Sequence, residues 1–259
     1  MERAVFVPDL DRLPPPAETY DRFYLGSEFC VSRLPGERGL HEAVAAAFRR
    51  GMGFSLVTPF LDEPGLERAL ALVRALPDDP RIEVVANDLG LIVALRDAGW
   101  AGALVAGRLL TRQRRGPGVE SFGAVPAAAA AALRASALDS PAFVGLLVSL
   151  YGVRRFELDD LVQGISVPPL PARVRLSLYR PWLLVTATRN CPWVFDGRTW
   201  EREGCARPCR GRLLRLTPEA PDPAALLFLG GCAQFVEHRT DAPLPPGVDR
   251  IVWQPEVPA

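Results

Sequence analysis

The first two thirds of the chain alternate between short apolar runs and helical patterns, and this alternation constrains the fold most. The runs typical of strands are Arg22–Gly26, Phe54–Thr58, Ile82–Ala86, Ala103–Ala106 and Val153–Phe156. The helical patterns are Leu40–Arg50, Pro64–Leu76, Leu89–Ala98, Ala124–Ala135 and Pro141–Tyr151. Strands and helices alternate in this way when helices cover a parallel sheet.

Five or six such units favour a (β/α) TIM-like barrel over an open sheet. The first unit looks truncated, because the segment between Val5–Val7 and Arg22–Gly26 is rich in proline and too short for a full helix. We therefore expect an α/β fold with an incomplete barrel. A further short helix is expected near Asp159–Gln163.

The character of the chain changes after the proline-rich Val167–Pro171. Further strand-like runs follow at Arg173–Leu178, Leu183–Thr188, Ala225–Leu229 and Arg250–Trp253. We expect one barrel domain over residues 1–259, with βα units in residues 1–166 and a strand-rich part in residues 167–259.

The composition is that of a soluble globular protein, with 49% hydrophobic and 23% charged residues. The formal net charge is zero, which makes nucleic acid a less favoured partner. All 30 basic residues are arginine, so lysine chemistry is not available. Neither a signal peptide nor a membrane span is apparent, so we expect a cytoplasmic protein. In the cytoplasm, clustered cysteines indicate metal or redox chemistry more than structural disulfides.

Three of the five cysteines lie in one polar loop, which reads NCPWVFDGRTWEREGCARPC from Asn190 to Cys209. Thirteen residues separate Cys191 from Cys205, and three separate Cys205 from Cys209. Thiols in such an arginine-bearing loop are poor material for a core, which favours a role as metal ligands.

Active sites of (β/α) barrels lie at the C-terminal ends of the strands, so polar residues that follow the strands are the site candidates. Candidate catalytic residues chosen in this way are Asp88, Arg108, Glu157 and Tyr179. Candidate substrate-binding residues are Glu28, Asn87 and Arg108. We expect Asp88, Arg108 and Glu157 to face one cavity together with the cysteines. Asn87 and Asp88 could equally cap the helix that follows them.

Cys30 follows the strand Arg22–Gly26, so it should reach the same rim as the cysteine loop and complete a set of four thiols. Cys232 lies beside an apolar strand and is interpreted as a packing residue. Four thiolates suit an iron–sulfur cluster or zinc. The scattered spacing favours a cubane cluster without excluding zinc.

An arginine-rich loop follows the strand Ala103–Ala106. It contains Arg112, Arg114 and Arg115. These side chains could hold an anionic substrate or partner, but a solvated loop is the favoured interpretation.

Several short motifs occur in an order that resembles peptidase family U-thirty-two, the collagenase-like family. The motifs are FYLGSEFC (Phe23–Cys30), VVANDLG (Val84–Gly90), LVAGRLL (Leu104–Leu110), RRFELDDL (Arg154–Leu161) and the C-x13-C-x3-C spacing. The likeness covers roughly residues 22–255. It is closest to the UbiV branch, which belongs to oxygen-independent ubiquinone biosynthesis.

The resemblance implies a (β/α) barrel that carries a 4Fe–4S cluster on Cys30, Cys191, Cys205 and Cys209. It also implies a heterodimer with a second family member of the UbiU type, which hydroxylates a small quinone precursor without dioxygen. Other branches imply hydroxylation of RNA bases, and a zinc-stabilised binding module remains a further alternative. Peptidase activity is the least favoured reading, because the chain contains neither H-E-x-x-H nor a nucleophile elbow.

Overall fold

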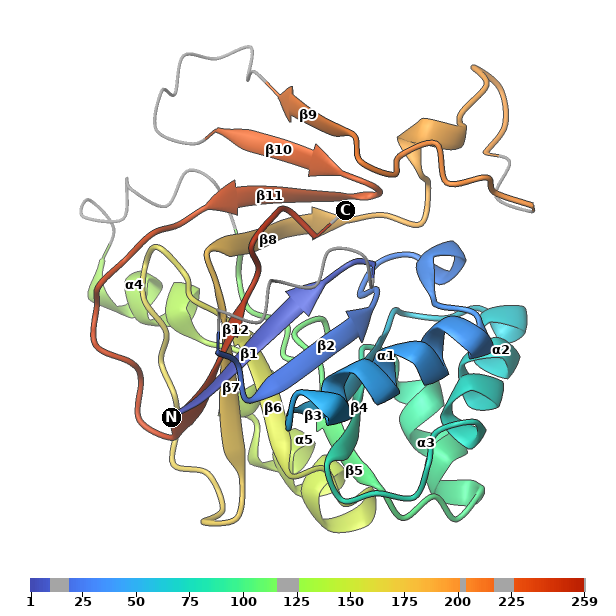
Figure 1. Ribbon diagram of the computed structural model, residues 1–259. Helices are drawn as coiled ribbons and strands as arrows, with labels where there is room; N and C mark the ends of the chain where they lie inside the picture. The colour runs from blue at the N-terminus through green and yellow to red at the C-terminus, as the bar shows by residue number, and fades with distance from the viewer. Residues whose placement is uncertain (10–18, 116–125, 201–203, 217–225, 259) are drawn as a thin grey trace.

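The structure, a computed structural model, describes residues 1–9, 19–115, 126–200, 204–216 and 226–258. Eight parallel strands form a closed barrel (Figure 1). In barrel order they are β1 (Glu2–Val7), β12 (Val248–Trp253), β7 (Arg175–Arg180), β6 (Arg155–Asp159), β5 (Ala103–Ala106), β4 (Ile82–Ala86), β3 (Gly53–Thr58) and β2 (Arg22–Gly26).

Helices cover the outside of the barrel. They are α1 (Glu37–Arg49), α2 (Glu63–Arg74), α3 (Leu89–Asp97), α4 (Ala127–Arg134) and α5 (Pro141–Gly145), with a π-helical turn at Leu146–Leu150 after α5. Helix α1 buries Leu40, Ala43, Val44 and Ala47, which recur at the spacing of one helical face. Within the described residues, no helix is long and apolar enough to cross a membrane.

A second, antiparallel sheet is inserted between β7 and β12. It runs in the order β8 (Trp182–Ala187), β11 (Ala233–Glu237), β10 (Leu227–Gly230) and β9 (Leu213–Leu216). This sheet lies over the end of the barrel to which the arrowheads of β1 and β2 point (Figure 1). Short 3-10 helices lie at Val31–Arg33, Ala137–Asp139 and Pro192–Val194.

The barrel interior contains a small apolar cluster and several charged side chains. The apolar members are Ala4, Phe6, Tyr24, Val57, Val85, Val105, Tyr179 and Val252. The hydroxyl of Tyr24 on β2 donates to Glu157 on β6 over 2.9 Å, and these strands are not neighbours. The two side chains therefore meet inside the barrel.

A separate buried cluster joins the mouth of the barrel to the second sheet. Its members are Phe29, Leu184, Cys232, Ala233, Phe235 and Val257. Phe29 from the barrel packs edge to face on Phe235 of β11, with ring centroids 5.5 Å apart. The second sheet is therefore held against the loop that carries Cys30.

The (β/α) barrel is confirmed, but the expected incompleteness is wrong. Strand β1 pairs in parallel with β2 on one side and β12 on the other, which closes the barrel. The short helix expected near Asp159–Gln163 is also wrong, because Asp159 is the last residue of β6 and a turn follows. Strands β9 and β11 were not expected. Most of the proline-rich segment before β2 lies outside the described residues, as do the first residues of the expected Ala124–Ala135 and Ala225–Leu229.

Candidate functional site

The turn after β2 places Cys30 at the mouth of the barrel. Strand β2 ends at Gly26, where φ is +129° and an added Cβ would lie 2.0 Å from the carbonyl oxygen of Val57. Only glycine fits such a position. The Ser27 hydroxyl oxygen then accepts hydrogen bonds from the backbone nitrogens of Phe29 (3.3 Å) and Cys30 (3.2 Å). These contacts fix the backbone that carries the Cys30 thiol.

The cysteine loop begins at the end of β8, which belongs to the second sheet and not to the barrel. Cys30, Cys191 and Cys205 are half-buried, and Cys209 is buried. Burial raises the pKa of the Cys191 thiol, and the charges of Cys209, Cys30 and Cys205 raise it further. Thiols from two distant chain segments therefore lie within electrostatic reach of one another.

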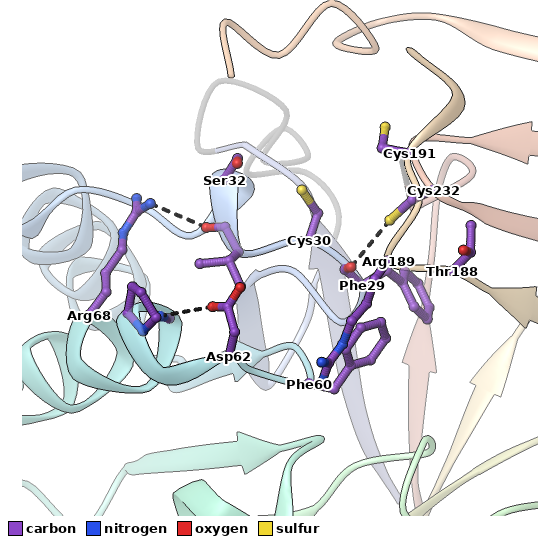
Figure 2. Close-up of a pocket in the computed structure, with 13 residues that line it drawn as sticks. Phe29, Cys30, Ser32, Phe60, Asp62, Arg68, Thr188, Arg189, Cys191 and Cys232 are labelled. Carbon is purple, nitrogen blue, oxygen red and sulfur yellow. Dashed lines mark hydrogen bonds between the residues drawn. The ribbon is translucent and has the colours of Figure 1, made fainter. Parts of the chain in front are cut away.

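A cavity of about 550 Å³ adjoins these thiols and is lined by Cys30, Cys191 and Cys232. Figure 2 shows the three sulfur atoms on its wall, with Phe60 and Arg189 beside them and Arg68 on the opposite side. The cavity is mixed in character, because apolar rings and arginines both face it.

Cys232 belongs to the buried cluster but also touches the cavity. Its thiol donates to the carbonyl oxygen of Phe29 over 3.2 Å. The neighbouring Cys232 thiol lowers the pKa of Cys30 to about 6, and the pKa of Cys232 is raised in turn.

The donor set fits a thiolate-bound group. Zinc held by cysteines requires four sulfurs about 2.3 Å from the ion. No three His, Cys, Asp or Glu side chains in the described part of the chain are close enough to hold a single metal ion. A cubane cluster binds each thiolate through a different iron, and its four ligands can lie farther apart.

A buried charge cluster lies behind the Cys30 loop. Arg108 is fully buried and forms ion pairs with Glu28 (2.6 Å) and Asp159 (2.6 Å). Arg115 reaches the other oxygen of Asp159 at 2.7 Å. Burial alone would raise the pKa of Asp159, but the charges of Arg108 and Arg115 lower it. Asp159 is therefore ionised, and Arg115 is not the solvated loop residue that the sequence favoured.

Glu157 lies deeper in the barrel between two tyrosines. Its carboxylate oxygens accept hydrogen bonds from Tyr24 (2.9 Å) and Tyr179 (2.7 Å). Burial raises the pKa of Glu157 to about 8. Burial also raises the pKa of both tyrosines, so they are neutral donors.

Asn87 and Asp88 both stabilise backbone at the mouth. Asp88 caps α3 by accepting from the nitrogen of Leu91 (3.2 Å), and its second oxygen accepts from Leu61 (3.1 Å). The Asn87 amide donates to the carbonyl of Thr58 (3.0 Å) and accepts from the nitrogen of Leu109 (3.0 Å). Asp88 therefore caps α3, as the capping interpretation predicted. Asn87 links the end of β3 to the loop after β5.

The structure does not bring Asp88, Arg108 and Glu157 to the cavity of the cysteines. Arg108 and Glu157 are completely buried, and none of the three lines that cavity. The expectation that these residues face one cavity with the cysteines was wrong, because side chains near the end of a strand can point into the barrel as well as towards its mouth. Tyr179 also points inward, from within β7.

Some residues of the site were missed from the sequence. Asp159 is one, although a signal for it exists: Arg155, Glu157 and Asp159 alternate with the apolar Phe156 and Leu158, which puts the charged residues on one face of the strand. Phe60, Arg68 and Arg189 carry no comparable signal, because they come from separate loops and a helix that only the fold brings together.

One solved structure resembles this fold and bears the description "The Structure of the U32 Peptidase Mk0906". The two chains are 14% identical, with a TM-score of 0.46, over 99% of this chain and 93% of the other. No family model matches the sequence, and no curated protein matches it.

Proposed function

We propose that the chain is an iron–sulfur protein in which Cys30, Cys191, Cys205 and Cys209 hold a 4Fe–4S cluster. The observation that carries this proposal is that Cys30 and Cys191, from two distant segments of the chain, line one cavity at the barrel mouth, and Cys205 and Cys209 follow in the loop of Cys191. A cubane held by protein alone uses four thiolates. Cys232 is the thiol left over, since it packs in the buried cluster and donates to Phe29.

The Cys30 thiol suits this role chemically. Metal ligands must be thiolates, and the pKa of Cys30, lowered to about 6, favours the ionised form at neutral pH. A bound cluster would supply one-electron redox chemistry at this position. The adjoining cavity, with Phe60, Arg68 and Arg189 on its wall, offers space for a small molecule beside the cysteines.

We expect purified protein to distinguish this cluster from zinc. Protein prepared without oxygen should be brown and contain about four irons per chain. Cys30→Ser, Cys191→Ser, Cys205→Ser and Cys209→Ser should each lose most of the visible absorption, because a ligand is removed. Cys232→Ser is the matched control and should keep it. Colourless protein with one zinc per chain, or a cluster lost only in Cys232→Ser, would contradict the assignment.

The finer proposal is a subunit of an oxygen-independent hydroxylase that acts on a quinone precursor, together with a second family member of the UbiU type. The order of the short motifs supports it, and the cavity beside the thiols is compatible with a small substrate. Deletion of the gene should therefore lower the quinone content of cells grown without oxygen. Restoring the wild-type gene should recover quinone, whereas Cys30→Ser should not. Normal quinone content in the deletion strain, with altered RNA hydroxylation, would favour the RNA-modifying alternative.

A further inference from the structure

The Arg108 side chain is shared between the loop of Cys30 and the start of the second sheet. Its Nε and Nη2 atoms donate to the two carboxylate oxygens of Glu28 over 2.8 and 2.6 Å. This is a bidentate fork, which fixes orientation as well as distance. Glu28 lies two residues before Cys30, so the fork holds the backbone of that loop.

The third nitrogen of Arg108 reaches the second sheet. Its Nη1 donates to the carbonyl oxygen of Trp182 over 3.1 Å and to Asp159 over 2.6 Å. The same Asp159 oxygen accepts from the backbone nitrogen of Leu184 over 3.2 Å. Trp182 and Leu184 belong to β8, which leads directly into the loop of Cys191.

We propose that Arg108 is a positioning residue that fixes the loop of Cys30 against β8 and so sets the separation of the Cys30 and Cys191 thiols. The effect of this positioning on a bound cluster rests on the proposed function. Other contacts of the Cys30 loop with this region are single: the Cys232 thiol donates to Phe29 over 3.2 Å, Arg207 donates to the Leu34 carbonyl oxygen over 3.4 Å, and Phe29 packs on Phe235. Only the Arg108 side chain forms a bidentate ion pair among these contacts. A lysine could not replace Arg108, since one ammonium cannot form the fork and reach β8 together.

A second buried ion pair provides the matched control. Arg250 bonds to Glu83 inside the barrel, and both are nearly as buried as Arg108 and Glu28. Glu83 lies on β4 and bonds to Arg250, Tyr24 and Ser55, which belong to the barrel strands β12, β2 and β3 and not to residues 27–34 of the Cys30 loop. Glu28→Gln and Glu83→Gln each remove one buried carboxylate charge from an arginine, but only Glu28→Gln releases the Cys30 loop.

Hydrogen exchange of the metal-free protein, followed by mass spectrometry, tests the positioning directly. Glu28→Gln should lower the protection of residues 27–34 by about tenfold, while Glu83→Gln should change it less than about twofold. Denaturant unfolding of both variants measures the general loss of stability. An equal loss of protection in both variants, or none in Glu28→Gln, would overturn the proposal. If Glu28→Gln does not fold, Glu28→Asp, which keeps the charge but shortens the side chain, takes its place with the same expected direction.

Cluster-loaded protein separates this inference from the proposed function. If the wild type holds the cluster, Glu28→Gln should release iron to a chelator about tenfold faster and alter the electron paramagnetic resonance spectrum of the reduced cluster. Glu83→Gln should match the wild type in both. Loaded variants that cannot be told apart would overturn the proposal. A wild type without iron would instead refute the cluster, and hydrogen exchange would still decide whether Arg108 positions the loop.

Discussion

At the scale of one residue, Glu157 shows how burial in the barrel interior changes the pKa of a carboxyl group. Among the residues that the structure describes, Glu157 has no cationic partner within hydrogen-bond distance, and its two side-chain oxygens accept only from Tyr24 and Tyr179. Burial therefore disfavours its ionised form, and its pKa rises from 4.5 to about 8. Glu83 is equally enclosed, yet the charges of Arg250 and Arg22 lower its pKa to about 2. The difference between these two carboxyl groups comes from their partners.

The raised pKa of Glu157 predicts a pH dependence of stability. A folded-state pKa above the unfolded value stabilises the protein fully below pH 4.5, and this contribution is lost as the pH rises through about 8. The free energy of unfolding of the wild type should thus fall by about 3 kcal/mol between pH 5.5 and pH 8. Urea unfolding of Glu157→Gln should show little of this slope, because the amide does not ionise. Glu83→Gln is the control and should keep the slope; a slope unchanged in Glu157→Gln would refute the assignment.

At the scale of elements, local patterns predicted several strands correctly, whereas the pairing of distant strands was not predicted. The strands Arg22–Gly26, Ile82–Ala86 and Ala103–Ala106 were predicted with the bounds that the structure has, because each is a short apolar run between turn residues. Strand β9 is exposed along most of its length and shows no buried face for a pattern to reveal. Strand β11 is short, and its sequence does not alternate cleanly in polarity, because the apolar Val236 lies on the same face as Gln234.

The sequence likewise predicted some features of the candidate site and not others. Cys30 and the loop cysteines were predicted to share one end of the molecule, and in the structure Cys30 and Cys191 line the same cavity. The sequence could not indicate that the loop extends from the second sheet, since strand pairing is not a local property. Nor could it show that Asp88 is engaged in capping α3 and bonding to Leu61. Which of several uses a carboxylate serves depends on contacts that only the fold creates.

At the scale of the whole molecule, the barrel depends on strands from the two ends of the chain. Strand β1 follows Met1 directly, and β12 lies after the inserted sheet, yet the two pair in parallel over four residue pairs. Strand β12 also pairs with β7, so it connects the inserted sheet back to the barrel. The expectation of an incomplete barrel was wrong because the pairing of β1 with β12, which closes the barrel, joins segments that are far apart in the sequence.

The position of β12 predicts that the fold fails without it. Removing residues 248–259 would open two hydrogen-bonded edges, one on β1 and one on β7. It would also remove Arg250 and leave Glu83 in the barrel interior without its main cation, a loss that costs about 3–5 kcal/mol for a buried pair. The lost strand pairing and the unpaired Glu83 together approach the whole free energy of unfolding of an ordinary domain. The truncated protein should show no cooperative transition in urea or on heating, measured by circular dichroism.

The control is a shorter truncation that removes only Pro258 and Ala259 and keeps the buried Val257. This protein should unfold cooperatively. Cooperative unfolding of the longer truncation would mean that the other seven barrel strands are stable without closure.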